Sequence, residues 1–366
     1  MTLETLRLSD FRNFGDLEVD FAGRTAAVWG PNGMGKTNLL EAVFLLGTTR
    51  SHRTRKDAEM VRFGARGYVV GGVFRRSGGE RTEIALAYEE GGRKRGRVDR
   101  KDVDRLASLV GLFGVVFVSP EDVEITRGGP DRRRQYLDLT LCSVDPVYLR
   151  ALQEYNRAHR QRGRLLREGR GPGLEAQIDS WDRQLARSAV PLDRARREAV
   201  DRLSPAAERT YADLGGGERL EMALVPGSGE GAVDEEALLE RLRAGREVDR
   251  RTGRTGVGPH RDDLEVLLDR RPIRSYGSRG QNRTAVLALK IGAARYMEER
   301  TGEKPLLLLD DVFTELDRSR SLALAERLRG EGQVFATGTD RGGLERYFPD
   351  AEWFSIREGG RLVREE

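Results

Sequence analysis

The sequence contains little cysteine and no long hydrophobic segment. Cys142 is the only cysteine among 366 residues, so no disulfide can form within the chain, which fits a reducing compartment. No apolar run approaches the roughly 18 residues that a membrane-spanning helix needs. The first ten residues, MTLETLRLSD, also lack the charged and apolar regions of a secretory signal peptide. We therefore expect a cytoplasmic protein with no membrane partner.

The apolar content is also low, because hydrophobic residues make up 38% of the chain and charged residues 34%. Periodic apolar segments nevertheless occur throughout, so we expect a folded protein with a polar surface. The net charge is +4, and the basic residues, nearly all arginine, cluster at Arg93–Lys101 and Arg132–Arg134. A run of charge is usually a solvated face, and a polyanion-binding surface is the alternative.

A glycine-rich segment gives the first chemical signal. The apolar strand TAAVW leads into GPNGMGKT and then into the helical segment NLLEAVFLLGTT. The pattern G-x-x-x-x-G-K-[ST] between a strand and a helix predicts a phosphate-binding loop. Lys36 would reach the β- and γ-phosphates, and the Thr37 hydroxyl would bind Mg²⁺. The candidate nucleotide-binding residues are Gly30, Pro31, Asn32, Gly33, Met34, Gly35, Lys36 and Thr37.

The segment LLLLDD at 306–311 gives the second signal. A buried strand that ends in carboxylates places Asp310 where it can hold Mg²⁺ beside Thr37. We therefore expect this strand to lie next to the phosphate-loop strand. Asp311, one residue further on, is a candidate to orient or deprotonate an attacking water, and capping the following turn is its alternative role.

The segment SYGSRGQ at 275–281 gives the third signal, because it opens an apolar helical segment as a second anion-reading turn would. The chain already has one phosphate loop, and most of its length separates Lys36 from Asp310. We therefore expect this turn to serve a nucleotide that is held by a second subunit. Its candidate residues are Ser278, Gly280 and Gln281.

Together these motifs resemble the ABC-type ATPases, whose LSGGQ signature closes over ATP held by a partner subunit. The N-terminal LRLSDFRNF is similar to the SMC-like DNA-repair ATPases within that class. Further stretches resemble the RecF family of bacterial recombination proteins, and this resemblance covers essentially the whole chain. They are SHRT (51–54), PEDVEITRGGPDRRRQYLD (120–138), GVGPHRDDLEV (256–266) and LLDDVFTELD (308–317).

The resemblance implies a weak, DNA-stimulated ATPase that binds ATP and Mg²⁺, forms a homodimer when ATP is bound, and acts at gaps, junctions and stalled forks. Its DNA partners would be double-stranded and single-stranded. RecR would be its protein partner, and with RecO it would help RecA to replace single-strand binding protein.

The resemblance also assigns roles to residues. ATP and metal binding fall to Lys36, Thr37 and Asp310, and contact with the partner's nucleotide falls to Ser278. Arg12 and Asn13 match positions near the phosphates in SMC-like proteins. Asp311 stands where most ABC-type ATPases have glutamate, which fits slow turnover. FVSPED has no glutamine where a Q-loop is expected, and ATGT has no histidine at the usual switch position near Thr337, so the way γ-phosphate is sensed stays open.

The expected fold is α/β, a two-lobed ABC-type (SMC-like) P-loop ATPase head. Lobe I would combine residues 1–119 and 303–366, and lobe II would be residues 120–302. Lobe II would carry the signature at 275–281 and a helical arm at about 131–205, in which two antiparallel helices meet at GRGPG. The candidate DNA contacts are Arg93, Lys94, Arg95, Arg132, Arg133 and Arg134.

Two other functions share part of this pattern. The ATPase subunit of a membrane transporter would have the same loop, signature and LLLLDD strand, but it would normally keep the glutamine and histidine switches. A scaffold that holds ATP without hydrolysing it would also have the loop, the signature and the LLLLDD strand. Multiple-turnover phosphate release would exclude this alternative.

Overall fold

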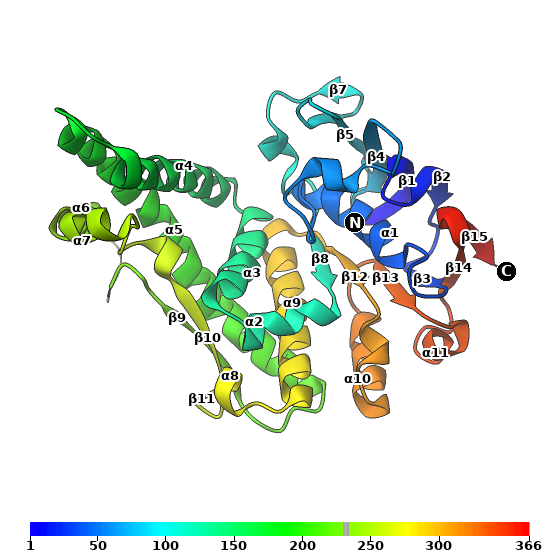
Figure 1. Ribbon diagram of the computed structural model, residues 1–366. Helices are drawn as coiled ribbons and strands as arrows, with labels where there is room; N and C mark the ends of the chain where they lie inside the picture. The colour runs from blue at the N-terminus through cyan, green and yellow to red at the C-terminus, as the bar shows by residue number, and fades with distance from the viewer. Residues whose placement is uncertain (230, 232–233, 366) are drawn as a thin grey trace. The chain divides into compact units, whose positions relative to one another are not determined.

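The computed structural model describes residues 1–229, 231 and 234–365 (Figure 1). The chain divides into two compact units. Unit 1 combines Met1–Val123, Ala206–Arg219 and Gly277–Glu366, and unit 2 combines Glu124–Pro205 and Leu220–Tyr276.

The observed units differ from the predicted lobes mainly in the place of helix α9 (Arg279–Thr301), which the sequence analysis put in lobe II. This helix packs on strand β8 (Val115–Val118) of unit 1. Lys290 donates a hydrogen bond to the Phe117 carbonyl at 2.8 Å and pairs with Asp122 at 2.8 Å. The helix that follows the signature is therefore part of the unit that carries the phosphate loop.

An antiparallel sheet forms one part of unit 1, in the order β2-β1-β4-β5-β6-β7. Its first strand alternates as a half-buried strand does, with Leu6 and Leu8 buried and Arg7 exposed. The strands are β1 (Thr2–Phe11), β2 (Phe14–Asp20), β4 (Gly67–Arg75), β5 (Arg81–Glu89), β6 (Arg95–Val98) and β7 (Lys101–Asp102).

A mostly parallel sheet forms the other part, in the order β15-β14-β3-β13-β12-β8. Its remaining strands are β3 (Thr25–Trp29), β12 (Leu306–Leu309), β13 (Val334–Gly338), β14 (Glu352–Arg357) and β15 (Arg361–Glu365). We expected β12 to lie next to β3, and this prediction is wrong, because β13 pairs with both of them. The carboxyl ends of these strands still meet at one edge of the sheet.

Short helical elements connect the strands of unit 1. They are α1 (Lys36–Thr48), α10 (Arg318–Leu328), α11 (Arg341–Glu345), η1 (Asp57–Met60), η2 (Leu106–Leu109), η3 (Pro120–Val123), η5 (Val312–Thr314) and η6 (Glu358–Gly360). Helix α1 is almost wholly buried, so it belongs to the core of the unit rather than to its surface.

Unit 2 is mostly helical and contains a small sheet in the order β11-β10-β9. Its elements are α2 (Glu124–Arg127), α3 (Pro130–Cys142), α4 (Pro146–Glu168), most of α5 (Leu174–Asp213), β9 (Leu220–Val225), α6 (Glu235–Ala244), α7 (Arg246–Thr252), η4 (Pro259–Arg261), β10 (Asp263–Leu268), β11 (Arg271–Pro272) and α8 (Ile273–Tyr276).

The arm contains one more helix than the sequence predicts. The segment 130–168 forms two helices rather than one, because Asp145 caps a new helix by accepting bonds from the amides of Val147 and Tyr148, with Pro146 in the first turn. Helix α5 runs without a break through Pro191 and Pro205.

Two buried arginines join α4 to α5. Arg162 pairs with Asp182 and, at 2.6 Å, with Asp249. Arg196 donates to the Tyr148 hydroxyl at 2.9 Å. Later residues of α4 thus meet earlier residues of α5, so the two helices are antiparallel, as predicted.

Arg196 also holds the loop before β10. It donates to the Pro259 carbonyl at 2.7 Å and pairs with Asp262 at 2.6 Å and Asp138 at 2.8 Å. Arg196 and Asp262 are both buried. Burial raises the pKa of Asp262, and the arginine opposes that effect. A buried carboxylate without its partner is costly, so this arginine holds the packing of unit 2 together.

We expect Arg196→Met to lower the free energy of unfolding of unit 2 by about 3–5 kcal/mol, because the substitution leaves Asp262 buried and unpaired. Urea denaturation followed by circular dichroism measures the change. Arg202→Met on the same helix is the matched control: its pair with Glu198 is exposed, so we expect a loss of less than about 1 kcal/mol. Equal losses in the two variants would contradict the prediction.

Candidate nucleotide-binding site

The phosphate loop lies between β3 and α1, as predicted. Gly30, Gly33 and Gly35 have φ values of 156°, 83° and 111°, which side chains rarely allow. A Cβ on Gly35 would lie 2.5 Å from the Asn13 amide nitrogen. Glycine is therefore required here by conformation and by space. The eight residues 30–37 form one turn that ends at the N-terminus of α1.

Lys36 is buried, and its ammonium lies within the loop. Its Nζ donates to the carbonyls of Gly30 at 2.7 Å and Pro31 at 3.2 Å. In the part of the chain that the structure describes, no carboxylate pairs with Lys36. Because neutral carbonyls hold the ammonium, its charge stays available for an anionic ligand.

The predicted metal ligands lie in contact. Thr37 Oγ1 donates to Asp310 Oδ2 at 2.7 Å, although 273 positions separate them. Thr337 Oγ1, on the intervening strand β13, donates to Asp310 Oδ1 at 2.9 Å. Burial raises the pKa of Asp310, and the two hydroxyls oppose this effect. A hydroxyl and a carboxylate are the oxygen ligands that Mg²⁺ prefers, so these residues fit the ion.

Asp311 adopts a strained conformation at the end of β12. Its φ is 49°, in the left-handed region, which costs a non-glycine residue about 1–3 kcal/mol. Its amide donates to Thr337 Oγ1 at 2.9 Å. Its Oδ1 atom is buried and has no hydrogen-bond partner among the described residues. Strain and an unpaired carboxylate oxygen at one residue beside Asp310 indicate a functional position.

Asn13 contacts the phosphate loop, whereas Arg12 binds the helix that follows the loop. Asn13 donates to the Met34 carbonyl of the loop at 2.8 Å and accepts from Asn38 at 2.7 Å. The Arg12 guanidinium instead binds the buried carboxylate of Glu41, with two contacts of 2.8 Å. Arg12 thus neutralises a buried carboxylate of helix α1.

Three residues near the loop were not predicted as site residues. Glu41 is fully buried and accepts from Arg12 and Ser51, and Asn38 binds both Asn13 and Arg53. A glutamate in the otherwise apolar helix NLLEAVFLL was the available signal for Glu41. For Thr337 the sequence offered no signal beyond the lack of a histidine at the switch position nearby.

The signature turn caps helix α9. The Ser278 hydroxyl accepts from the Gln281 amide at 3.2 Å, and the Ser278 amide donates to Gln281 Oε1 at 2.7 Å. Gly280 lies against Arg320, whose NH1 would be 2.8 Å from an added Cβ. Ser278 and Arg279 are exposed. Among the described residues, no hydrogen bond joins this turn to the phosphate loop.

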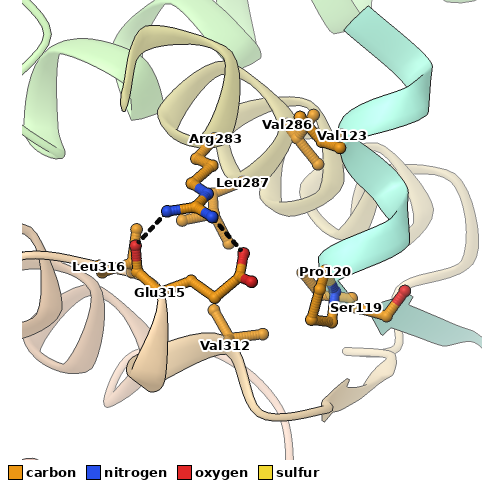
Figure 2. A pocket seen from close by; sticks show the side chains of 10 residues that line it. Ser119, Pro120, Val123, Arg283, Val286, Leu287, Val312, Glu315 and Leu316 are labelled. Atoms are coloured by element: carbon orange, nitrogen blue, oxygen red, sulfur yellow. Dashed lines mark hydrogen bonds and ion pairs between the residues drawn. The ribbon is translucent and has the colours of Figure 1, made fainter. Parts of the chain in front are cut away.

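A small pocket lies between α9 and the segment that follows Asp311 (Figure 2). Its empty volume is about 350 Å³, part of it open to solvent, and its lining is mostly apolar. Arg283 of α9 crosses the pocket to bind the Glu315 carbonyl at 2.9 Å and the Glu315 carboxylate at 3.0 Å (Figure 2). The signature helix and the Asp311 segment are therefore connected directly.

The six predicted DNA contacts differ in exposure. Arg93, Arg95 and Arg132 are exposed. Lys94 pairs with Asp57, and its side chain is only 10% exposed. Arg133 is buried and makes a two-bond pair with Asp263, at 2.6 and 2.9 Å, and Arg134 binds Asp131 and the Asp262 carbonyl. Lys94 and Arg133 are therefore held by ion pairs within the chain, and the DNA contacts stay a prediction.

The fold and the site together define an ABC-type P-loop head of the SMC kind. Residues 2–347 match the family described as RecF/RecN/SMC N terminal domain. The chain has a TM-score of 0.59 and 16% identity with an Smc head domain from Pyrococcus furiosus, covering 100% of this chain and 96% of that one. At this identity the likeness concerns the fold alone, and it confirms the predicted fold class.

The chain belongs to the RecF family. It is 41% identical to the DNA replication and repair protein RecF of Geobacter sulfurreducens and 38% identical to that of Moorella thermoacetica; 93% of this chain is covered in both cases, with 93% and 91% of the relatives. It matches a solved structure of the recombination mediator protein RecF-ATPrS in the RecFOR pathway, with a TM-score of 0.91, 32% identity, and coverage of 100% and 98%. In the part of the chain that the structure describes, no helix is long and apolar enough to cross a membrane.

We expect Thr337→Val to weaken Mg²⁺-dependent nucleotide binding about tenfold, because it removes the bonds to Asp310 and to the Asp311 amide. Titration with a fluorescent nucleotide at several Mg²⁺ concentrations measures the effect. Thr337→Ser keeps the hydroxyl and should bind as the wild type does. If the valine variant has an unchanged Mg²⁺ dependence, the hydroxyl does not orient the carboxylate.

Proposed function

We propose that this chain is an ATP-dependent DNA-binding protein of replication and repair, which dimerises when ATP binds and separates when ATP is hydrolysed. The observation that carries the proposal is the 2.7 Å contact between Thr37 and Asp310 at the N-terminus of α1. It places a hydroxyl and a carboxylate beside a phosphate loop in a chain whose relatives are RecF proteins. A RecF chain that is 32% identical to this one has been solved in a form designated RecF-ATP.

The residues of the loop would bind the nucleotide by charge and by backbone donors. The amides of residues 33–37 and the positive end of the α1 dipole would surround the phosphates, and Lys36 would turn from the loop carbonyls to the β- and γ-phosphates. Thr37 and Asp310 would hold Mg²⁺, which would neutralise charge on phosphate oxygens. Asp311 would orient and deprotonate the attacking water.

The exposed signature turn supports a role in a second subunit. Helix α9 is 23 residues long, and the N-terminus of such a helix favours an anion. Ser278 is exposed, and among the described residues its hydroxyl only accepts from the Gln281 amide, so this hydroxyl could donate to a γ-phosphate held by a partner copy. When the turn contacts a partner's nucleotide, the Arg283–Glu315 contact would transmit a shift of helix α9 to the segment that begins at Asp311.

The DNA partner follows from the family and from the exposed basic residues. We propose binding to double-stranded and single-stranded DNA at gaps and junctions, with ATP hydrolysis stimulated by DNA. RecR would be the protein partner. Together with RecO and RecR, this protein would promote the loading of RecA onto single-stranded DNA in the cytoplasm. Dimerisation would join two DNA-binding surfaces, so ATP would strengthen binding without any new contact.

We expect Asp311→Asn to keep ATP binding and to trap the ATP-bound dimer, because only activation of the water is lost. Phosphate release should fall by at least about 100-fold, and light scattering should show a persistent dimer. Asp310→Ala is the contrasting variant and should lose Mg²⁺-dependent binding itself. Hydrolysis by Asp311→Asn at the wild-type rate would remove Asp311 from its assigned role. Phosphate release by the wild type that never exceeds one turnover would favour a scaffold.

We expect Ser278→Arg to leave ATP binding by the monomer near normal but to prevent ATP-dependent dimerisation, because a long cationic side chain would fill the gap between subunits. A mixture with Lys36→Met is the sharper test. The mixed dimer contains one nucleotide site made of two intact halves, so ATP should drive some association that neither variant shows alone. Light scattering with and without ATP and DNA measures this. Loss of ATP binding by the Ser278→Arg monomer would show that the turn belongs to its own chain's site.

A further inference from the structure

Phe63 is the most exposed large apolar side chain described, with a relative exposure of 104%. Its backbone is nevertheless fixed. The Arg62 amide donates to the Asp10 carbonyl at 2.8 Å, the Ala65 amide closes a turn on the Arg62 carbonyl at 3.0 Å, and Val61 forms a bridge with Phe11. Burying a phenylalanine stabilises a protein by roughly 1.5–3 kcal/mol, and this turn forgoes that gain while holding the ring in solvent.

Basic residues flank the turn that carries Phe63, and some of them pair with acidic neighbours. The Arg62 guanidinium lies against Gly15 and is half-exposed, with a pair to Asp10 of 3.5 Å. Arg66 is exposed, and its carbonyl accepts from the Glu90 amide at 2.7 Å, which brings the β5–β6 turn beside it. The Lys94–Asp57 pair joins that same turn to η1.

The exposed basic residues of 53–66 and of the β5–β6 turn are Arg53, Arg55, Lys56, Arg62, Arg66, Arg93 and Arg95. Lys56 pairs with Glu59 at 3.3 Å, and Arg95 pairs with Glu89 at 3.9 Å. Among the described residues, Arg55, Arg66 and Arg93 have no ion-pair partner. We call this set, with Phe63, the aromatic–basic surface. It lies in unit 1, on the segments that follow α1 and on the β5–β6 turn.

We propose that Phe63 stacks on an unpaired DNA base at the edge of a gap while the arginines around it contact the flanking phosphates. The proposal rests on the DNA-binding function proposed above and adds the residue that contacts the unpaired base and the way it does so. An aromatic ring within a basic surface is the chemistry that binds single strands, because every base has a face for stacking and every linkage has a phosphate.

The surroundings favour a nucleic acid over a protein at this surface. A protein that covered Phe63 with an apolar groove would also have to bury or neutralise the unpaired arginines beside it, at a cost for each uncompensated charge. A DNA strand offers a flat apolar face and anionic oxygens together. A stacked base also needs no groove on this chain, which fits a ring standing alone at the tip of a turn.

Phe63→Ala tests the proposal on two DNAs. One is a duplex with a short gap in one strand that leaves thymines of the other strand unpaired, and the second is a continuous duplex of equal length. With ATP present, the variant should bind the gapped DNA about tenfold more weakly than the wild type, with little change on the duplex. Phe63→Trp should retain wild-type affinity, and its added fluorescence should be quenched by the gapped DNA alone. Val147→Ala, which removes another exposed apolar side chain, is the matched control and should bind both DNAs normally.

The outcomes separate the two proposals. If the wild type binds both DNAs with salt-dependent affinity but Phe63→Ala binds the gapped DNA equally well, stacking by Phe63 is overturned and DNA binding stands. Equal weakening on both DNAs also overturns it, since no unpaired base is then being read, and a protein partner would become the occupant to test. If the wild type binds neither DNA, the proposed function fails, and this inference fails with it.

Discussion

The contact between Thr37 and Asp310 is the constraint on which the architecture depends. It joins residues 273 positions apart, and it forms because strands from both ends of the chain enter one mostly parallel sheet. Strand β13 lies between their strands and supplies Thr337, whose hydroxyl links Asp310 to the Asp311 backbone. The sheet therefore determines which oxygens converge at the loop, and the rest of the chain is accommodated as insertions between these strands.

Buried ion pairs hold the backbone in place both beneath the phosphate loop and within unit 2. Glu41 is fully buried beneath the phosphate loop and is satisfied by Arg12 and Ser51. In unit 2, Arg162 and Arg196 join helices and loops that are far apart in sequence. Each of these charges is costly to bury without its partner, so each favours one arrangement of the backbone over close alternatives.

The sequence predicted the elements that depend on local chemistry and missed those that depend on tertiary contacts. The loop, the LLLLDD strand and the capped signature helix follow from short patterns, and all three formed where expected. Strand order, the assignment of α9 to unit 1 and the burial of Lys94 and Arg133 depend on partners far along the chain, such as Asp57 and Asp263. Helix α5 also continues through Pro191, where the neighbouring Ala189 and Leu192 are buried, so packing outweighs a local helix breaker.

The order of the parallel sheet has a consequence for synthesis of the protein. Strand β3 is hydrogen-bonded on one side to β13 and on the other to β14, and both emerge more than 300 residues later. At about 5–20 residues per second, a ribosome needs roughly 15–60 seconds to deliver the first of them. During that interval β3 has no neighbour in its final sheet, and the phosphate loop has no fixed strand to start from. Until β13 is made, the nascent chain therefore carries an apolar strand with both edges open, and unpaired edges of this kind promote aggregation.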